Sequence, residues 1–234
     1  MKNQYINQIT EDFNFSHSAL FKHLTPSEVE RISLDKTINT YKKGLCIYRQ
    51  NSRITGCYIV LDGILKVYKT GIDGKEQIIR FAKPYDIIGF RSVLNGDLAC
   101  TTAKTLEDSK LCYISQESLY YLVKNNGNFA FELLQLACRE LGEANEYITD
   151  IAQKTVRERL AEVLVHLKQE FGIDKENILQ ILLTREELAN IVGTATESVI
   201  RLLSEFKNDN LIEIEGRKIK ILNFNGLIKV ANLN

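Results

Sequence analysis

The chain has 234 residues, of which 44% are hydrophobic and 26% are charged. This length is that of two ordinary domains, and the composition is typical of a globular protein and excludes a chain that is disordered throughout. Thirty basic residues balance thirty acidic residues, so any surface that binds nucleic acid must be local.

The chain begins MKNQYINQITEDFNF, which has no apolar run after its early lysine and therefore lacks the pattern of a secretory signal. No later stretch approaches the roughly 18 uninterrupted apolar residues of a membrane-spanning helix. We expect a soluble, cytoplasmic protein with no membrane partner.

The five cysteines are widely separated and include no CxxC pair. An odd number at such spacing argues against a disulfide framework and against a zinc site. We therefore expect reduced thiols, buried on strands and on a helix, and no bound metal.

Residues 16–115 predict a short helix followed by many short strands. A helix over 16–33 is indicated by a cap at Thr25, a first-turn proline and an early acidic residue. From about residue 38, apolar and polar residues alternate in runs separated by turn signals. These runs are CYIVL at 57–61, ILKVYKT at 64–70, EQIIRF at 76–81 and KLCYIS at 110–115. Many short strands at this spacing are typical of an antiparallel barrel or jelly roll.

A long amphipathic helix is predicted over 128–153, after a shorter helix over 116–124 and a break at 125–127. Its apolar residues keep helical spacing for about seven turns, far longer than an ordinary surface helix. Such a helix needs a second surface, and its own copy in a dimer supplies one. Packing wholly against its own barrel is the alternative. The expected dimer-interface residues are Leu133, Ala137, Leu141, Ala144, Ile148 and Ile151.

Residues 181–223 predict two helices joined by a tight turn and followed by two strands. Thr184 and Glu187 form a capping box that begins a helix over about 185–191. Gly193 supplies the turn, and a second helix over about 195–207 buries an apolar face. This is the helix-turn-helix geometry, in which the second helix enters the major groove of DNA.

The strands that follow predict a wing. Residues 211–214 and 218–222 alternate around a turn at 215–217. Arg217, Lys218 and Lys220 lie near the tip, which places positive charge locally, as the neutral total of the chain requires. From their positions on the first helix and the wing, Arg185, Arg217 and Lys218 are expected to hold DNA phosphates.

Glu197 and Arg201 lie four residues apart on the outward face of the second helix. Arginine can hold the O6 and N7 edge of guanine with two hydrogen bonds, and glutamate can accept from the N4 amine of cytosine. The pair therefore predicts base reading. One alternative is a surface ion pair between the two side chains. Another is an enzyme or scaffold, since both also contain helix pairs with glycine turns, but the wing favours DNA binding.

The segment TREELANIVGTATESVIRLLSEFKNDNLIEIEGRKIKI resembles the DNA-binding domain of the cyclic AMP receptor and fumarate-nitrate reduction regulators, the CRP/FNR family. The resemblance covers almost the whole chain. LDGILKVYKTGIDGKEQIIRFAKPYDIIGF resembles the sensor domain of that family, and VRERLAEVLVHL resembles the first helix of its DNA-binding domain. The long helix over 128–153 falls where the dimer helix of the family lies.

The resemblance assigns roles to several residues of the second helix. Glu197 and Arg201 correspond to the base-reading pair, and Thr196 falls on a third reading position that is often arginine in the cyclic AMP receptor branch. Ile200 stands where the oxygen-sensing branch tends to carry serine. The resemblance implies a half-site that keeps a central TGA-like core. Arg185 and Ser198 match positions that touch phosphates.

The sensor domain departs from the cyclic-nucleotide pocket of the family, which is a glycine-glutamate pair followed by an arginine and a small hydroxyl residue. Gly89 is followed by Phe90 instead of glutamate, and the stretch at 99–102 offers Thr101 and Thr102 but no arginine. Without that charge to pair with the cyclic phosphate, cyclic AMP is disfavoured. Arg91 is a candidate substitute if its loop turns it inward.

Two other cofactors of the family, an iron-sulfur cluster and haem, depend on cysteine and histidine ligands. A [4Fe-4S] cluster needs four thiolates as ligands. Residues 1–45 contain no cysteine, so Cys112 is alone at a position that resembles the fourth ligand of the family. The cluster is therefore disfavoured. Haem is not excluded, because His17, His23 and His166 exist, although none has the context of an axial ligand.

These observations predict an α+β protein in three parts. An antiparallel β-barrel sensor domain of the jelly-roll, cyclic-nucleotide-binding-like kind covers 1–127, a dimerisation helix covers 128–153, and a winged helix-turn-helix covers 154–234. We expect a non-enzymatic transcription regulator that binds palindromic double-stranded DNA as a homodimer under an unknown small-molecule effector, with RNA polymerase as a further candidate partner. The alternative function is a cyclic-nucleotide-binding regulatory module that acts on a protein partner.

Overall fold

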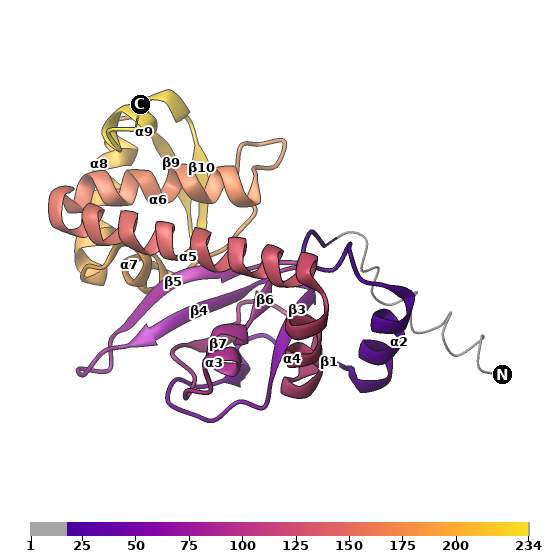
Figure 1. Ribbon diagram of the computed structural model, residues 1–234. Helices are drawn as coiled ribbons and strands as arrows, with labels where there is room; N and C mark the ends of the chain where they lie inside the picture. The colour runs from indigo at the N-terminus through magenta and orange to yellow at the C-terminus, as the bar shows by residue number, and fades with distance from the viewer. Residues whose placement is uncertain (1–17, 234) are drawn as a thin grey trace. The chain divides into compact units, whose positions relative to one another are not determined.

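The computed structural model describes residues 18–233, and the contacts divide the chain into two compact units between Gly142 and Glu143 (Figure 1). The helix predicted over 16–33 is wrong in its first half. Within the described residues, 18–23 form bends and turns, and helix α2 spans Pro26–Asp35. The helix begins there because Thr25 caps it and the proline, which has no N–H to donate, occupies its first turn. The predicted three-part division of the chain stays a prediction.

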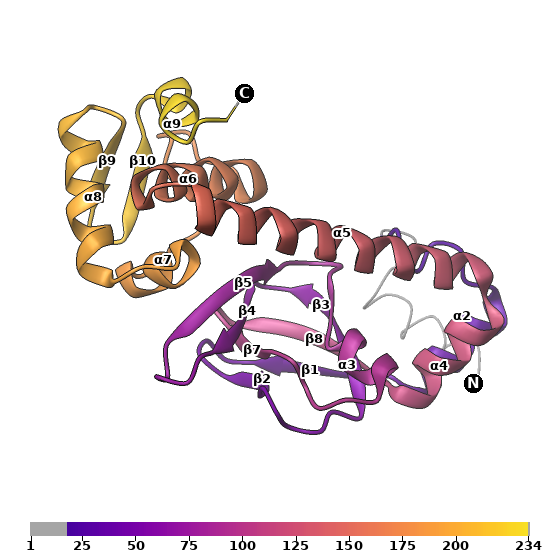
Figure 2. The same cartoon turned by 60° about the vertical axis from the view of Figure 1, so that its left-hand side comes forward.

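Two antiparallel four-stranded sheets form the first unit (Figure 1, Figure 2). Their orders are β1-β8-β3-β6 and β2-β7-β4-β5. The predicted antiparallel strands and the α+β class are therefore confirmed. The strands are β1 (Thr37–Tyr41), β2 (Cys46–Tyr48), β3 (Gly56–Asp62), β4 (Leu65–Thr70), β5 (Glu76–Ala82), β6 (Ile87–Ile88), β7 (Thr102–Thr105) and β8 (Ser109–Ser115).

Helices pack on this unit through one apolar core. Besides α2, they are α3 (Phe90–Asn95) and α4 (Gln116–Asn125). Side chains from the strands, such as Ile59 and Ile114, are fully buried against Leu119 and Leu122 of α4. The alternating strand pattern supplies one apolar face to this core, because successive side chains of a strand point to opposite sides.

Helix α5 spans Gly127–Gln153, close to the predicted 128–153. Its start is fixed by Asn126, whose Oδ1 accepts from the backbone N of Phe129 at 2.9 Å and whose Nδ2 donates to Glu28 Oε2 at 2.8 Å. Phe129 and Leu133 are buried in the core of the first unit. A second row of α5 side chains is exposed at alternating steps of three and four residues: Phe131, Leu134, Cys138, Leu141, Asn145, Ile148 and Ala152.

The second unit contains four further helices and a two-stranded sheet. Helices α6 and α7 both begin with a capping box, at Thr155 with Glu158 and at Thr184 with Glu187. Their buried side chains include Leu164 and Leu188, which are fully buried. The elements are α6 (Val156–Phe171), α7 (Arg185–Val192), α8 (Thr196–Asn208), β9 (Ile212–Glu215), β10 (Lys218–Ile221) and α9 (Phe224–Val230).

Candidate functional site

Helices α7 and α8 form the predicted helix-turn-helix, with bounds within a residue of those expected. The turn depends on Gly193, which caps the end of α7 at φ 72°. This left-handed conformation is open to glycine and strained for most other residues. The Gly193 N–H closes the last turn of α7 by donating to the Ala189 carbonyl at 2.9 Å. Local sequence rules therefore determine where the first helix of the pair ends and the turn begins.

Helix α8 divides into a buried face and an exposed face. Val199, Leu203 and Phe206 are essentially fully buried. Glu197 and Arg201 are exposed, and Ile200 between them is exposed at 49%. An isoleucine held in solvent on the same face as two charged side chains is available for contact with a partner such as the thymine methyl group in a major groove.

Arg201 forms an ion pair with Glu205, so the alternative pairing of Glu197 with Arg201 is not the one formed. Glu205 also contacts Arg157 of α6 at 3.0 Å, and Arg157 contacts Asp209 at 2.7 Å. Glu197 forms no ion pair with any residue from 18 to 233. Sequence reasoning missed Glu205, although its spacing of four residues from Arg201 was a signal.

The N-terminus of α8 has no side-chain cap, because Ala195 occupies the cap position. Thr196 and Ser198, the predicted contacts to a base and to a phosphate, lie in its first turn and are half-buried. Free backbone N–H groups at a helix start favour anions such as phosphate. The uncapped start is therefore compatible with a DNA backbone lying against it.

Strands β9 and β10 form the predicted wing, with Lys218 opposite Glu215 and Lys220 opposite Glu213. Arg217 and Lys218 are both exposed, whereas Lys220 lies 3.6 Å from Glu213. Positive charge at the turn therefore faces solvent, as expected for phosphate contacts.

Arg185 links the start of α7 to the wing. Its Nη2 donates to the Gly216 carbonyl at 2.8 Å, and its Nη1 is buried without a hydrogen-bond partner among the described residues. Burial lowers the pKa of the guanidinium from its ordinary value, although arginine stays charged at neutral pH. Arg185 therefore connects the start of α7 to the wing, and its unpartnered Nη1 is not open to solvent.

The predicted effector residues of the sensor unit do not all face one space. Phe90 is 2% exposed and belongs to the apolar core, and Gly89 adopts φ 82° at the start of α3. Thr101 and Thr102 are buried, and the Thr102 hydroxyl accepts from the backbone N of Gln50 at 2.9 Å. Arg91 alone presents a charge, and it contacts Glu140 of α5.

The predicted dimer-interface residues fall on two faces of α5. Leu133 is 4% exposed inside the sensor core, and Ala137 packs against the same core. Leu133 is therefore covered within its own unit, whereas Ala137 is half-buried. Leu141 and Ile148 are 62% and 65% exposed, and Ile151 is 41% exposed. Ala144 is half-buried.

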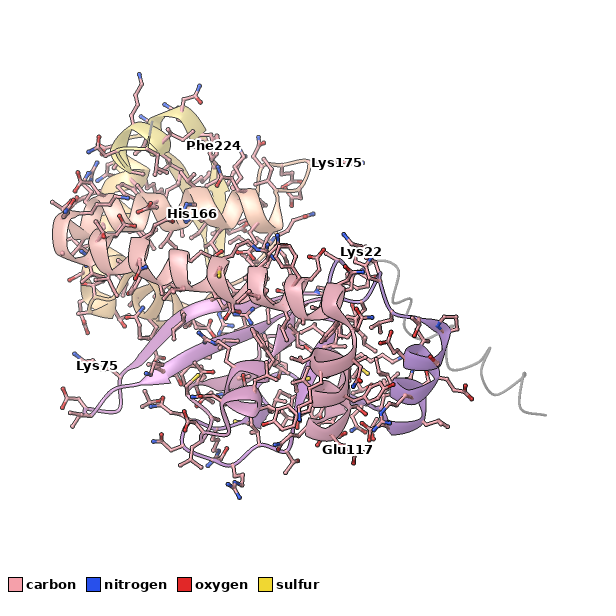
Figure 3. The ribbon with its side chains drawn as sticks, in the orientation of Figure 1. Lys22, Lys75, Glu117, His166, Lys175 and Phe224 are labelled. Atoms are coloured by element: carbon pink, nitrogen blue, oxygen red, sulfur yellow. The ribbon has the colours of Figure 1, made fainter. Side chains whose placement is uncertain are left out.

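The cysteines and histidines form no metal site among residues 18–233, where no three of the metal-binding side chains come together. Cys57 and Cys112 are buried, which raises the pKa of their thiols to about 12 and about 11. His166 lies on the exposed side of α6 (Figure 3), and His17 lies outside the described residues. In the same described part of the chain, no helix has the length and apolar character needed to cross a membrane.

Comparison with known proteins matches both units. Residues 38–126 match the cyclic nucleotide-binding domain family, and residues 158–230 match the Crp-like helix-turn-helix domain family. The transcriptional activator protein Anr of Pseudomonas protegens is 30% identical over 77% of this chain and 75% of its own length. The fumarate and nitrate reduction regulatory protein of Vibrio cholerae is 28% identical over 94% of this chain and 89% of its own.

Solved structures show the same fold. A putative regulator of the family from Eubacterium rectale has a TM-score of 0.78 at 22% identity and covers 94% of this chain and 100% of its own. FixK2 from Bradyrhizobium japonicum has a TM-score of 0.74 at 24% identity and covers 83% and 96%. With a helix-turn-helix, a wing and a two-sheet sensor domain in matching order, this chain belongs to the CRP/FNR superfamily of transcription regulators.

Proposed function

We propose that this protein regulates transcription as a cytoplasmic homodimer that binds a palindromic DNA site under the control of a signal sensed by its two-sheet domain. The observation that carries the proposal is the exposed face of α8, where Glu197, Ile200 and Arg201 lie opposite a fully buried face. A helix of this kind beside a basic wing suits insertion into a major groove. Members of the family are transcription regulators and not enzymes, and the same is proposed for this chain.

Two groups of residues would contact DNA in different ways. Arg201 and Glu197 would read base edges, with Thr196 as a third reading position, because they lie on the exposed face and first turn of α8. The phosphate-contacting residues would be Arg185, Ser198, Arg217 and Lys218. These groups lie at a helix start or on the wing, where they set register rather than sequence.

The exposed row on α5 is the proposed dimer contact. Steps of three and four residues from Phe131 to Ala152 give the spacing by which two parallel helices interlock. The proposed row contains Leu141 and Ile148 of the expected interface. The other expected interface residues lie outside the row: Leu133, Ala137, Ala144 and Ile151. Regulators of this family act as dimers, and two copies of α8 would then reach half-sites about 10 to 11 base pairs apart.

The effector of the proposed sensor is not cyclic AMP. The threonines at 101 and 102 are buried, and no arginine accompanies them to pair with a cyclic phosphate. Calorimetry with cyclic AMP at millimolar concentration should show no specific heat, and binding tighter than about 10 µM would contradict this part of the proposal. RNA polymerase is a proposed partner because several relatives are named transcriptional activators.

A selection experiment tests the proposed function. The full chain is mixed with random duplexes, and bound duplexes are recovered and sequenced. We expect enrichment of an inverted repeat whose half-site centres lie about 10 to 11 base pairs apart. No enrichment, or enrichment of a single half-site by a chain that light scattering shows to be dimeric, would overturn the proposal. The alternative function, a module that acts on a protein partner, predicts no enriched sequence.

A further inference from the structure

A buried carboxylate lies between two arginines in the sensor unit. The Glu140 side chain of α5 is 8% exposed. Its Oε1 lies 3.1 Å from Arg80 Nη2 of β5, and its Oε2 lies 3.2 Å from Arg91 Nε of α3. Three separate elements therefore meet at one negative charge, and sequence reasoning identified only Arg91 among them.

The Glu140 carboxylate is close to both guanidinium groups but poorly aligned with them. Neither oxygen accepts a hydrogen bond of good geometry from the described residues. Arg80 instead directs its N–H groups to the carbonyls of Phe81 at 3.3 Å and Ile87 at 3.0 Å, and lies 3.9 Å from Asp86. A buried charge without aligned hydrogen bonds is costly, so a better-aligned anion can compete for this position.

Room for such an anion lies next to Arg80, and Arg91 gives access from solvent. Arg80 lines a cavity of about 240 Å³, whose wall also includes Tyr85 and Leu136. The Arg91 side chain is 46% exposed, so an incoming ligand can reach it from solvent. The cavity can hold the body of a small organic molecule while its acidic group faces the Arg80 guanidinium, on the side away from the cavity carboxylates of Asp86 and Glu132.

We propose that Arg80 and Arg91 form an anion-binding site in which Glu140 is an internal occupant, displaced when a small molecule carrying a phosphate or carboxylate group binds. The inference rests on the proposed function, because it names the ligand class of the proposed sensor. Displacement frees α5 from β5 and α3 at Glu140, two residues before Gly142, where the contacts of the chain divide. Ligand binding would thereby change the constraint on the helix that joins the two units.

Two small anions serve as probes of the site, inorganic phosphate for the phosphate class and succinate for the carboxylate class. Calorimetry compares the full-length wild type with Glu140→Gln, which removes the competing charge and leaves both arginines in place. We expect the variant to bind one of these anions at least about tenfold more tightly than the wild type. The anion that gains affinity identifies the class. Adding Arg91→Gln to Glu140→Gln should abolish the gain.

Glu117→Gln is the matched control, since Glu117 is an 85% exposed glutamate of α4 that also pairs with an arginine (Figure 3). It should bind both anions as the wild type does. If Glu140→Gln gains affinity for neither anion, the three residues form a structural ion pair and the proposal is wrong.

A measurement on the wild type keeps the test valid if Glu140→Gln does not fold. Amide hydrogen exchange around residues 136–142 is followed as phosphate or succinate replaces chloride at constant ionic strength. We expect faster exchange with the effective anion, and unchanged exchange with both anions would overturn the proposal. A chain that gains anion affinity but selects no DNA sequence would contradict the proposed function and leave the anion site in place.

Discussion

Arg201 forms an ion pair with Glu205, one turn further along α8, while Glu205 also contacts Arg157 of α6 at 3.0 Å. The arginine proposed to read bases is therefore paired with a carboxylate that also contacts another helix. If Arg201 reads a guanine edge as proposed, it must exchange this carboxylate for base acceptors, and Glu205 would then compete with DNA for it.

Removing the competing charge should strengthen DNA binding. Glu205→Gln is expected to raise affinity for the selected site about twofold to fivefold, because an exposed ion pair is worth less than about 1 kcal/mol. Fluorescence anisotropy titrations measure the change. Asp209→Asn is the matched control, since Asp209 contacts Arg157 but not Arg201. Equal gains in both variants would mean that only net charge matters.

Base reading and phosphate contact should respond differently to mutation. Arg201→Ala is expected to cost about 1 to 3 kcal/mol on the selected palindrome and to weaken discrimination at one guanine per half-site. Lys218→Ala should weaken binding to all sequences about equally and lower the salt slope by about one. Titrations on the selected site, its single-base variants and random duplex, at several salt concentrations, separate the two effects. A uniform loss in Arg201→Ala would make Arg201 a phosphate contact.

Substitutions of two neighbouring leucines of α5 should affect different properties: one should weaken the dimer and the other should lower folding stability. Leu134→Glu, like Leu141→Glu or Ile148→Glu, places like charges together across a symmetric seam and should dissociate the dimer at micromolar concentration. Leu133→Ala leaves a cavity in the sensor core and should lower the free energy of unfolding by about 2 to 5 kcal/mol without dissociating the dimer. Light scattering and urea unfolding measure the two outcomes. A dimeric Leu134→Glu variant would refute the proposed seam.

Glu28 should make stability depend on acid pH. Burial tends to raise the pKa of its carboxyl, but hydrogen bonds from Thr25 and Asn126 outweigh burial and lower the pKa below its ordinary value of 4.5. A lowered folded-state pKa means that the stabilisation is present above the unfolded-state pKa and is lost as pH falls through the folded-state pKa.

Urea unfolding from about pH 7 to about pH 3 tests this dependence. Glu28→Gln should be less stable than the wild type near neutral pH and should lose less stability on acidification. Glu30→Gln, on the exposed side of the same helix, should keep the wild-type dependence. An unchanged acid dependence in Glu28→Gln would show that its hydrogen bonds do not stabilise the fold.

The sequence by itself determined the DNA-binding elements closely. Thr184 with Glu187 begins α7, and Gly193 ends it, because capping and left-handed turns depend on residues only a few positions apart. The buried and exposed faces of α8 followed from helical spacing for the same reason. The predicted start of the first helix is wrong, because the capping box at Thr25 and the proline at Pro26 begin the helix there.

Only the tertiary structure decided which face of α5 packs on its own core and which stays exposed. Leu133 and Leu134 are equally apolar and adjacent, so periodicity could not say which one the barrel covers. The tertiary structure also decided the ion-pair partner of Arg80 and Arg91, because Glu140 lies far along the chain from both. Spacing rules act within a few residues, whereas these contacts depend on how strands and helices distant in sequence pack together.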